Sequence, residues 1–288
     1  MAALVVTIAL AALSAAGAGY CVFAAAALAR LLARARREHH GRGRPVAPVS
    51  LLVPVAGADP AFPESARDFL AQRDAGEHEV VFCVLDPADR GAIEAARAAI
   101  AAAKLPAERA RVAVGNGRSS GPNRKVSNLA QGIAAARFDV IAMVDADMRP
   151  EPDFLERLVA PLLDRGAALS TSLYRGHDPR GVGGAFEALA IDADFIPSVA
   201  VAQALEPVRF ALGAAIALRR EALAAIGGIE PLGRYIGEDY HLGRLVAERV
   251  GPVAFAPAVL PTHIGHMTLA AHVRHQVRWA RTVRAQRP

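Results

Sequence analysis

VIAMVDADMRP, residues 140–150, joins five apolar residues to two aspartates that stand one position apart. A short apolar run bounded by polar residues is typical of a strand buried on both faces, as in a parallel sheet. Asp145 and Asp147 would then follow the carboxyl end of this strand, where open α/β sheets bind their ligands. Two carboxylates there can hold Mg²⁺ or Mn²⁺ together with diphosphate oxygens. The alternative is a pair of polar turn residues, but the apolar strand before the pair and the helix start PEPD (150–153) after it favour the metal site.

Outward from residues 140–150, short apolar runs alternate with helical segments. We predict strands at 49–55, 79–85, 111–114 and 140–144, and helices at 64–72, 90–103 and 125–136. Such alternation forms βαβ units and a mostly parallel sheet. After Asp147 the pattern is less regular, with helices predicted at 152–163 and 239–249 and strands at 167–172 and 210–219. We therefore expect an α/β catalytic domain over residues 48–267, followed by a basic amphipathic helix at 268–288 that lies at the membrane interface.

The segment FEALAIDADFIPSVAVAQAL, residues 186–205, is long and apolar. Asp192, Asp194 and Pro197 interrupt it, and we predict that it is too broken to form a spanning helix. It can lie in the membrane interface. It can equally form an ordinary core helix with a proline bend, and both interpretations stay open.

The N-terminus carries no charged side chain in its first 29 residues. About 20 apolar residues span a bilayer as a helix, so we predict a single transmembrane helix at residues 1–33. The run is too long for the apolar core of a signal peptide, and no basic residue precedes it. Six arginines against one glutamate at residues 30–44 give a basic juxtamembrane linker, which we place at 34–47. Since basic flanks stay cytoplasmic, we expect the domain to face the cytoplasm from the inner membrane.

The basic charge of the chain lies at its two ends. Residues 30–44 carry a net charge of +5, equal to that of the whole chain, and five more arginines follow Ala270. The pI near 9.7 therefore indicates attraction to anionic lipid headgroups, and we expect no nucleic acid partner. Cys21 and Cys83 cannot form a disulfide framework, which suits a reducing compartment.

Two further polar motifs precede the aspartate pair. Asp86 and Asp89 follow an apolar run in VLDPAD (84–89). A carboxylate there can accept a hydrogen bond from the N–H of a uracil ring, although Asp86 can equally be only a helix N-cap. Lys125, in GPNRKVSNL (121–129), starts a helix near the same edge of the sheet and can reach a phosphate or the base. A solvated lysine is the alternative.

Two motifs stand near the C-terminus. Glu238 and Asp239 open a helix, where the helix dipole alone favours acids, but they also suit a general base presented on a loop. Arg278 offers a permanent charge for phosphate, and Trp279, the only tryptophan, offers a flat wall for an acceptor. HIGH (263–266) superficially matches a signature of class I aminoacyl-tRNA synthetases, but it lies at the wrong end of the chain. The histidines 263, 266, 272 and 275 complete no zinc ligand set.

Taken in order, these motifs resemble the ceramide glucosyltransferase family of inverting GT-A glycosyltransferases, and in particular its bacterial branch named for hopanoid biosynthesis. The resemblance runs from about Val49 to Pro288, and its specificity comes from order and spacing. It is carried by VFCVLDPAD (81–89), NRKVSNL (123–129), VIAMVDADMRPEPDFL (140–155), GAAIALRREALAAIGG (213–228), YIGEDYHLG (235–243) and RWARTVR (278–284). It implies a GT-A fold, a UDP-sugar donor carrying glucose or N-acetylglucosamine, a lipid acceptor such as ceramide or a hopanoid polyol, and Mg²⁺ or Mn²⁺.

The resemblance also implies roles for individual residues, since the family has three aspartate sites and a (Q/R)xxRW motif. The first aspartate site is Asp86, with Asp89 as a nearby alternative, and the third is Asp239. Asp86 and Lys125 would bind uridine, and Asp147, with Asp145, would hold the metal. Asp239, next to Glu238, would take the proton of the acceptor hydroxyl, so that a single displacement inverts the anomeric centre. Arg278, beside Trp279, would stabilise the charge that develops on UDP.

The chain departs from the family pattern in two ways. His275 stands at the first position of (Q/R)xxRW, and the chain stops at Pro288, whereas family members commonly continue into further membrane helices. We expect either a fragment or a protein that relies on one N-terminal helix and interfacial segments. A processive polysaccharide synthase is the nearest rival but needs a transmembrane channel, and a nucleotidyltransferase leaves the EDY and RW motifs unexplained. A non-catalytic membrane adaptor would use only the anchor and the basic ends.

Overall fold

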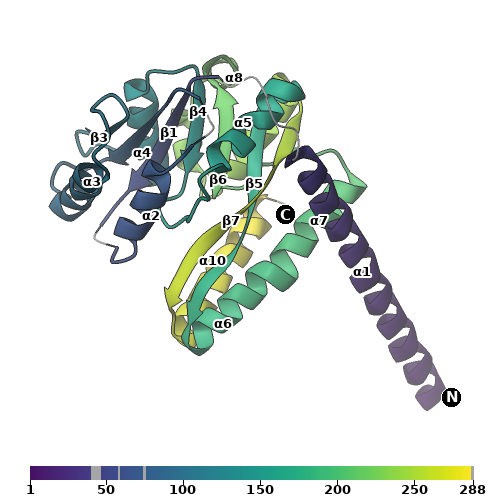
Figure 1. The fold of residues 1–288 in the computed structure, drawn as a ribbon. Helices are drawn as coiled ribbons and strands as arrows, with labels where there is room; N and C mark the ends of the chain where they lie inside the picture. The colour runs from purple at the N-terminus through teal and green to yellow at the C-terminus, as the bar shows by residue number, and fades with distance from the viewer. Residues whose placement is uncertain (40–46, 58, 74–75, 287–288) are drawn as a thin grey trace.

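One seven-stranded sheet forms the centre of the protein (Figure 1). The structure is a computed structural model that describes residues 1–39, 47–57, 59–73 and 76–286. The strands are β1 Val49–Val55, β2 His78–Val84, β3 Ala110–Val114, β4 Val140–Val144, β5 Leu169–Arg180, β6 Ala215–Arg219 and β7 Val253–His266. They run in the order β3-β2-β1-β4-β6-β5-β7. The first four are parallel, β6 is antiparallel to both of its neighbours, and β5 and β7 are parallel.

Helices cover both faces of this sheet. On one face α2 Phe62–Leu70, α3 Arg90–Ala103 and α5 Phe154–Asp164 pack into a first core, and on the other α4 Arg124–Ala135, α8 Arg220–Ala225 and α9 Glu238–Arg249 pack into a second. In β1, Leu51 faces the first core and Leu52 the second, because successive side chains of a strand point to opposite faces. Burial on both faces explains why this strand is apolar at almost every position.

The strands and helices predicted between residues 49 and 144 agree with the structure within two residues. The strands at 49–55 and 140–144 and the helix at 90–103 begin and end where the sequence predicts. After Asp147 the helices predicted at 152–163 and 239–249 are α5 and α9. The strand predicted at 210–219 begins only at Ala215. The order of strands and helices in the first half of the chain could therefore be predicted from the sequence pattern.

The strand pair β5 and β7 was predicted poorly. The strand predicted at 167–172 continues to Arg180, and β7 was not predicted at all. The two strands pair in parallel as far as Arg180 and His266, with a register shift between Thr171 and Leu173. Their distal halves project beyond the other strands (Figure 1) and read RGHDPR (175–180) and PTHIGH (261–266), which lack an apolar run. The HIGH tetrapeptide is thus the end of a strand.

Residues 181–205 form one helical rod rather than a broken segment. α6 Gly181–Leu189 continues through a π-helical stretch, η1 Ala190–Phe195, into α7 Ile196–Leu205. Pro197 falls in the first turn of α7, where proline is tolerated. By length and composition this rod is one of two described helices that could cross a membrane, so Asp192, Asp194 and Pro197 do not break the helix as we predicted. Only 22% of its most apolar window is buried. Most of the rod is therefore not the ordinary core helix that was our second interpretation.

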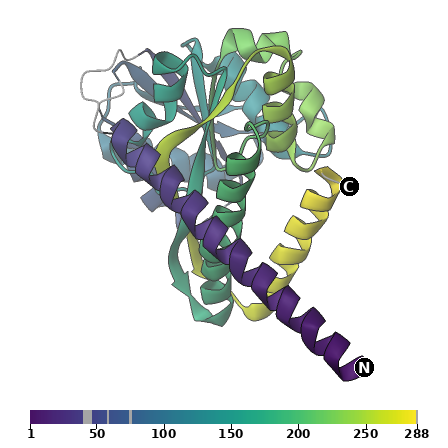
Figure 2. The same ribbon diagram turned by 90° about the vertical axis from the view of Figure 1, so that its right-hand side faces the viewer.

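The other helix of that kind is α1 Ala2–His39, which leaves the domain as a long rod (Figure 2). Its first turns are exposed, and near its end it contacts α7 and β7. Leu28 and Leu31 pack there with Ile196 and Val199 in a third, small core. The helix thus runs six residues past the boundary predicted at residue 33. The rest of the predicted linker, up to residue 46, lies outside the described residues.

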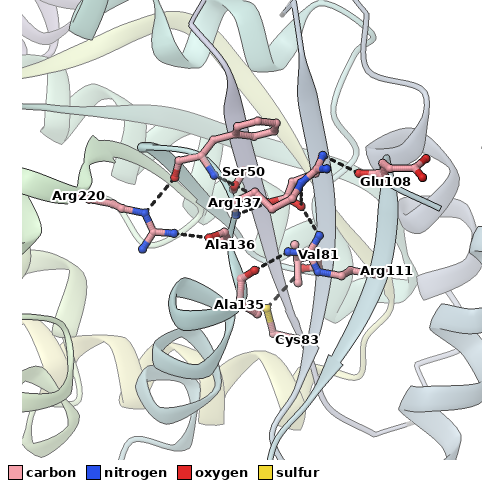
Figure 3. A network of polar contacts seen from close by, with 11 residues as sticks. Ser50, Val81, Cys83, Glu108, Arg111, Ala135, Ala136, Arg137 and Arg220 are labelled. Atoms are coloured by element: carbon pink, nitrogen blue, oxygen red, sulfur yellow. Dashed lines mark hydrogen bonds and ion pairs between the residues drawn. The ribbon is translucent and has the colours of Figure 1, made fainter. Parts of the chain in front are cut away.

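A polar network holds the amino ends of the central strands together (Figure 3). The Glu79 side chain, on β2, is fully buried. It accepts hydrogen bonds from Ser50 Oγ and Arg137 N, both at 2.6 Å, and pairs with the guanidinium groups of Arg111 and Arg137. Arg220 donates to the carbonyls that end α4 and follow it, those of Ile133, Ala136 and Phe138. The network fixes the strands at the edge opposite to their carboxyl ends, where the predicted site residues stand.

Candidate active site

Asp145 and Asp147 stand directly after β4, between the starting loop of β6 and the long strand β7. Asp145 N donates to Ala214 O at 3.1 Å, and Asp147 O accepts His263 N at 2.9 Å. Thr262 Oγ1 donates to Asp147 Oδ2 at 3.3 Å. The extended part of β7, which the sequence did not reveal, therefore orients the second aspartate.

Lys125 lies in the first turn of α4 and reaches the same carboxylates. Its Nζ lies 2.5 Å from Asp145 Oδ1 and 3.4 Å from Glu238 Oε1, and it donates to Gly213 O at 3.3 Å. Burial disfavours the charged amine, but the two carboxylates outweigh it and raise the pKa of Lys125 above its usual range. The lysine thus stays charged and neutralises part of an acidic cluster.

Glu238 and Asp239 open α9 and complete this cluster. Asp239 accepts hydrogen bonds from two backbone amides, Gly213 N to Oδ2 at 2.7 Å and Tyr240 N to Oδ1 at 2.8 Å. Glu238 Oε2 accepts one from Asn123 Nδ2 at 2.8 Å. The structure therefore brings Lys125, Asp145, Glu238 and Asp239 into the lining of a single pocket.

Asn123 is a member of this arrangement that sequence reasoning missed. Its Oδ1 accepts Lys125 N at 3.1 Å as the N-cap of α4. Its Nδ2 donates to Glu238 and, at 3.0 Å, to Tyr235 O. A cap residue two positions before Lys125 was the available signal, but the link to Glu238, 115 residues away, has none in the sequence.

Two carboxyl groups of the cluster, those of Asp147 and Asp239, have raised pKa values. Burial and the nearby charge of Asp145 raise the pKa of Asp147 to about 6. Burial and the charge of Glu238 raise the pKa of Asp239 to about 6, although Lys125 lowers both. The site thus holds more negative charge than its lysine neutralises. A cation or a proton would stabilise it, and a carboxylate with such a pKa is suited to act as a general base.

The aspartate pair also fits a divalent metal, if the substrate supplies further ligands. No group of three or more His, Cys, Asp or Glu side chains is placed to hold a metal ion among the residues that the structure describes. Asp145 and Asp147 offer only hard oxygen ligands, and their mutual repulsion is incompletely relieved. Mg²⁺ and Mn²⁺ are commonly held by one or two carboxylates together with substrate phosphates. The residues present suit that kind of site and not a closed protein cage.

Asp86 and Asp89 lie at the end of β2, outside the carboxylate cluster. Asp86 Oδ1 accepts Ala88 N at 2.9 Å and Oδ2 lies 3.7 Å from an Arg124 guanidinium nitrogen, but the side chain is 43% exposed, which leaves room for a ligand. Asp89 is the N-cap of α3, accepting Ala92 N at 3.2 Å, and also accepts Gly57 N at 2.7 Å. The N-cap of α3 is therefore Asp89 and not Asp86, for which we had considered this role. The Asp89 carboxylate oxygens are bound to backbone amides.

Trp279, on α10 Leu269–Gln286, belongs to an aromatic group beside the cluster. Its ring centroid lies 5.6 Å from Phe195, 6.3 Å from Tyr174 and 5.1 Å from His275. Burial and then the charges of Asp239, Asp145 and Asp147 raise the pKa of Tyr174 well above its usual value, so its phenol lies in the field of the site carboxylates. Tyr174 had no signal in the sequence, because it lies in the unpredicted part of β5.

The last turn of α10 packs against the loop before Glu238. A Cβ atom at Gly237 would meet the side chains of Gln286 and Thr282. Arg278 lies on the outer face of α10 and is exposed. The structure thus places α10 next to Gly237, which precedes Glu238, and Trp279 against Tyr174, but leaves the Arg278 side chain in solvent.

Known proteins resemble this chain in sequence. Residues 7–288 match the family described as Glycosyl transferase family 21. Ceramide glucosyltransferase 1 of Caenorhabditis elegans is 24% identical over 255 residues, which cover 88% of this chain and 53% of that protein. Ceramide glucosyltransferase of Komagataella phaffii is 33% identical over 124 residues, which cover 41% of this chain and 24% of that protein. The chain spans about half the length of the first of these relatives, and less of the second.

Solved structures resemble its fold. Mannosyltransferase PcManGT from Pyrobaculum calidifontis, in complex with GDP-Man and Mn²⁺, has a TM-score of 0.54 at 20% identity, covering 90% of this chain and 76% of that one. Glucosyl-3-phosphoglycerate synthase from Mycobacterium tuberculosis, in complex with Mn²⁺, UDP-glucose and phosphoglyceric acid, has a TM-score of 0.50 at 19% identity, covering 86% and 85%. The predicted GT-A fold, with mostly parallel strands and an N-terminal apolar helix, is confirmed. Because the family match extends over almost the whole sequence, the chain belongs to glycosyl transferase family 21.

Proposed function

We propose that the chain transfers a sugar from a UDP-sugar, carrying glucose or N-acetylglucosamine, to the hydroxyl group of a membrane lipid. The observation that carries the proposal is the single cluster of Lys125, Asp145, Asp147, Glu238 and Asp239 at the carboxyl ends of the strands. Ligands of open α/β sheets bind at that edge. Membership of family 21 and the ceramide glucosyltransferase relatives support the reaction class and the lipid acceptor.

The donor is proposed to bind along the edge from β2 to β4. Asp86, which is half exposed, accepts the N–H of the uracil ring. Lys125 faces the diphosphate once a ligand competes for its bond with Asp145. Asp145 and Asp147 would hold Mg²⁺ or Mn²⁺, which would supply positive charge to the diphosphate leaving group. Asp89, already bound to two backbone amides, serves to shape this end of the site and is the weaker candidate for a direct contact.

Asp239 is proposed to be the general base. Two backbone amides fix its carboxylate, and its raised pKa of about 6 lets it accept a proton near neutral pH. It takes the proton of the acceptor hydroxyl while that oxygen bonds to the anomeric carbon. The bond from this carbon to the diphosphate oxygen breaks on the opposite face, so an α-linked donor gives a β-linked product. Glu238, bound to Lys125 and Asn123, orients the lysine.

The C-terminal helix α10 is proposed to meet both the acceptor and the membrane. Trp279 forms a wall of the acceptor site with Tyr174 and Phe195. Arg278 is exposed on α10, and its proposed contact with UDP requires that its side chain turns toward the donor. The arginines of α10 and its exposed valines suit an interface of anionic lipids.

The membrane arrangement is part of the proposal. α1 anchors the domain, and the arginines of residues 30–44, which begin inside its C-terminal turns, favour a cytoplasmic orientation at the inner membrane. The exposed apolar residues of the α6–α7 rod then lie beside the bilayer, where a ceramide or a hopanoid polyol presents its hydroxyl.

The test is sugar transfer by membranes that contain the full chain. They are given UDP-glucose or UDP-N-acetylglucosamine, Mg²⁺ or Mn²⁺, and extracted bacterial lipids. We expect a glycolipid that disappears with Asp147→Ala and persists with Glu94→Ala, a control on the exposed side of α3. A polymer in place of a glycolipid would point to a processive synthase. Absence of transfer together with absence of metal-dependent UDP binding, measured by calorimetry, would favour a non-catalytic adaptor and refute the proposal.

A further inference from the structure

Glu187 is a carboxylate buried in the otherwise apolar helix α6. Its side chain is 2% exposed, and side chains of α10 bind both of its oxygens. His272 Nδ1 lies 2.7 Å from Oε2, His275 Nδ1 lies 2.6 Å from Oε1, and Gln276 Nε2 donates to Oε2 at 3.2 Å. A carboxylate withdrawn from water is expensive to leave without partners. The position of α10 on α6 therefore depends on this contact.

The partners of Glu187 lie on the face of α10 that carries Trp279. Residues 272, 275, 276 and 279 are spaced by three, four and seven positions, which places them on one side of a helix. The His275 ring lies 5.1 Å from the Trp279 ring. Fixing the histidines thus also fixes the tryptophan against Tyr174 and Phe195.

The backbone around α6 is shaped for this close approach. A Cβ atom at Gly183 would lie 2.2 Å from the carbonyl oxygen of Thr268, just before α10, so a side chain there would push the helices apart. The Phe186 ring stacks on His272, with centroids 6.0 Å apart. Two independent features, a glycine at the crossing and a shared buried carboxylate, therefore build one interface between α6 and α10.

We infer that Glu187 is a positioning residue, which clamps α10 through His272, His275 and Gln276 and thereby holds Trp279 against Tyr174 and Phe195. The role of Trp279 toward a lipid hydroxyl rests on the proposed function, whereas its position against these two rings does not. The clamp also gives His275 a place in the site. His275 stands where the ceramide glucosyltransferase family has Gln or Arg, and in this chain it is a hydrogen-bond partner of Glu187.

The chain offers a direct reporter, because Trp279 is its only tryptophan. In Glu187→Gln we expect Trp279 emission to move to longer wavelength and acrylamide quenching to rise about twofold, since the ring loses part of its cover. We expect kcat/KM for the lipid acceptor to fall about tenfold, with UDP affinity within about twofold of the original. His275→Gln keeps a hydrogen-bond donor for Glu187 and should retain the Trp279 emission and quenching of the unaltered chain. Glu94→Gln, on the exposed side of α3, is the matched control and should change neither the fluorescence nor the transfer.

Unchanged emission and quenching in Glu187→Gln would overturn the inference, whatever happens to transfer. A parallel loss of UDP binding would also overturn it, because it would indicate a general loss of structure. If Glu187→Gln does not accumulate, the double variant His272→Ala with His275→Ala carries the same expectations. Failure of the unaltered chain to transfer any sugar would refute the proposed function alone, since the fluorescence readout is independent of activity.

Discussion

Replacing Asp239 by asparagine removes the proposed base while keeping the size of its side chain. General-base catalysis contributes about 10²–10⁴-fold, so we expect kcat to fall by at least about a hundredfold. The folded domain should survive, because an amide oxygen can still accept one of the two backbone N–H groups that now bind Asp239. UDP affinity should stay within about twofold, since the diphosphate is held by other residues.

The pKa of Asp239 sets the size of the pH effect. Burial and the charge of Glu238 raise it to about 6. The base acts when deprotonated, so kcat/KM should rise with pH through about 6. A group with that pKa is deprotonated in about one molecule in eleven at pH 5 and about ten in eleven at pH 7, which gives roughly a tenfold change. The pKa of Asp147 is also about 6, so the profile is recorded at saturating metal.

The assay measures initial rates of glycolipid formation between pH 5 and 8 in membranes that contain the full chain. Near-normal turnover by a folded Asp239→Asn variant would refute the reasoning, as would a flat profile. Glu238→Gln is the neighbouring control. If Glu238→Gln abolished transfer while Asp239→Asn did not, the base would be Glu238.

Three further outcomes follow from the packing and the charges. Glu79→Gln leaves Arg111 and Arg137 without their buried charge partner and should lower the free energy of unfolding by about 3 kcal/mol in urea titrations. The pKa of Glu79 is lowered in the folded state. The loss of unfolding free energy in Glu79→Gln should therefore be complete at pH values above the ordinary pKa of a glutamate, and should shrink as the pH falls below that pKa. Gly132→Ala would bring a Cβ atom 2.3 Å from Cys83 Sγ and should destabilise by about 1–3 kcal/mol despite the better helix propensity, which thermal unfolding can check. Lys125→Met removes a cation that lowers the pKa of Asp147 and Asp239, so the acid limb of the kcat/KM profile should move to higher pH; an unmoved limb would contradict the proposed electrostatics.

The first half of the fold was readable because its strands are buried on both faces. β1 and β4 are apolar runs packed between two cores, and their bounds were predicted without error. β7 is as long as any strand in the sheet, yet it was missed. Its first half, VAFAPAVL (253–260), is a buried apolar run that patterning could have revealed. Its distal half, PTHIGH (261–266), pairs with β5 and has no apolar run, so apolar patterning could not have predicted that part.

The candidate site was predicted as far as each residue stands at a strand end or a helix start. Asp145 follows the parallel strand β4, and Lys125 starts the helix after β3, so both lie at the edge where parallel strands end. Glu238 and Asp239 start α9, and Asp239 is held there by Gly213 N, just before the antiparallel strand β6. Asn123 and Glu187 were missed, since each acts through partners about 85 to 115 residues away. Glu187 in particular lies in a helix whose other residues are apolar or small. Only the position of α10 shows that its carboxylate has hydrogen-bond partners.

The most direct test of the central claim is the anomeric configuration of the product. Membranes that contain the full chain are given the UDP-sugar that supports transfer, and the purified glycolipid is examined by proton NMR. The anomeric coupling should show a single β-linked sugar per lipid, as one displacement assisted by Asp239 requires. An α-linked sugar would contradict the account, because one in-line displacement on an α-linked donor cannot produce it.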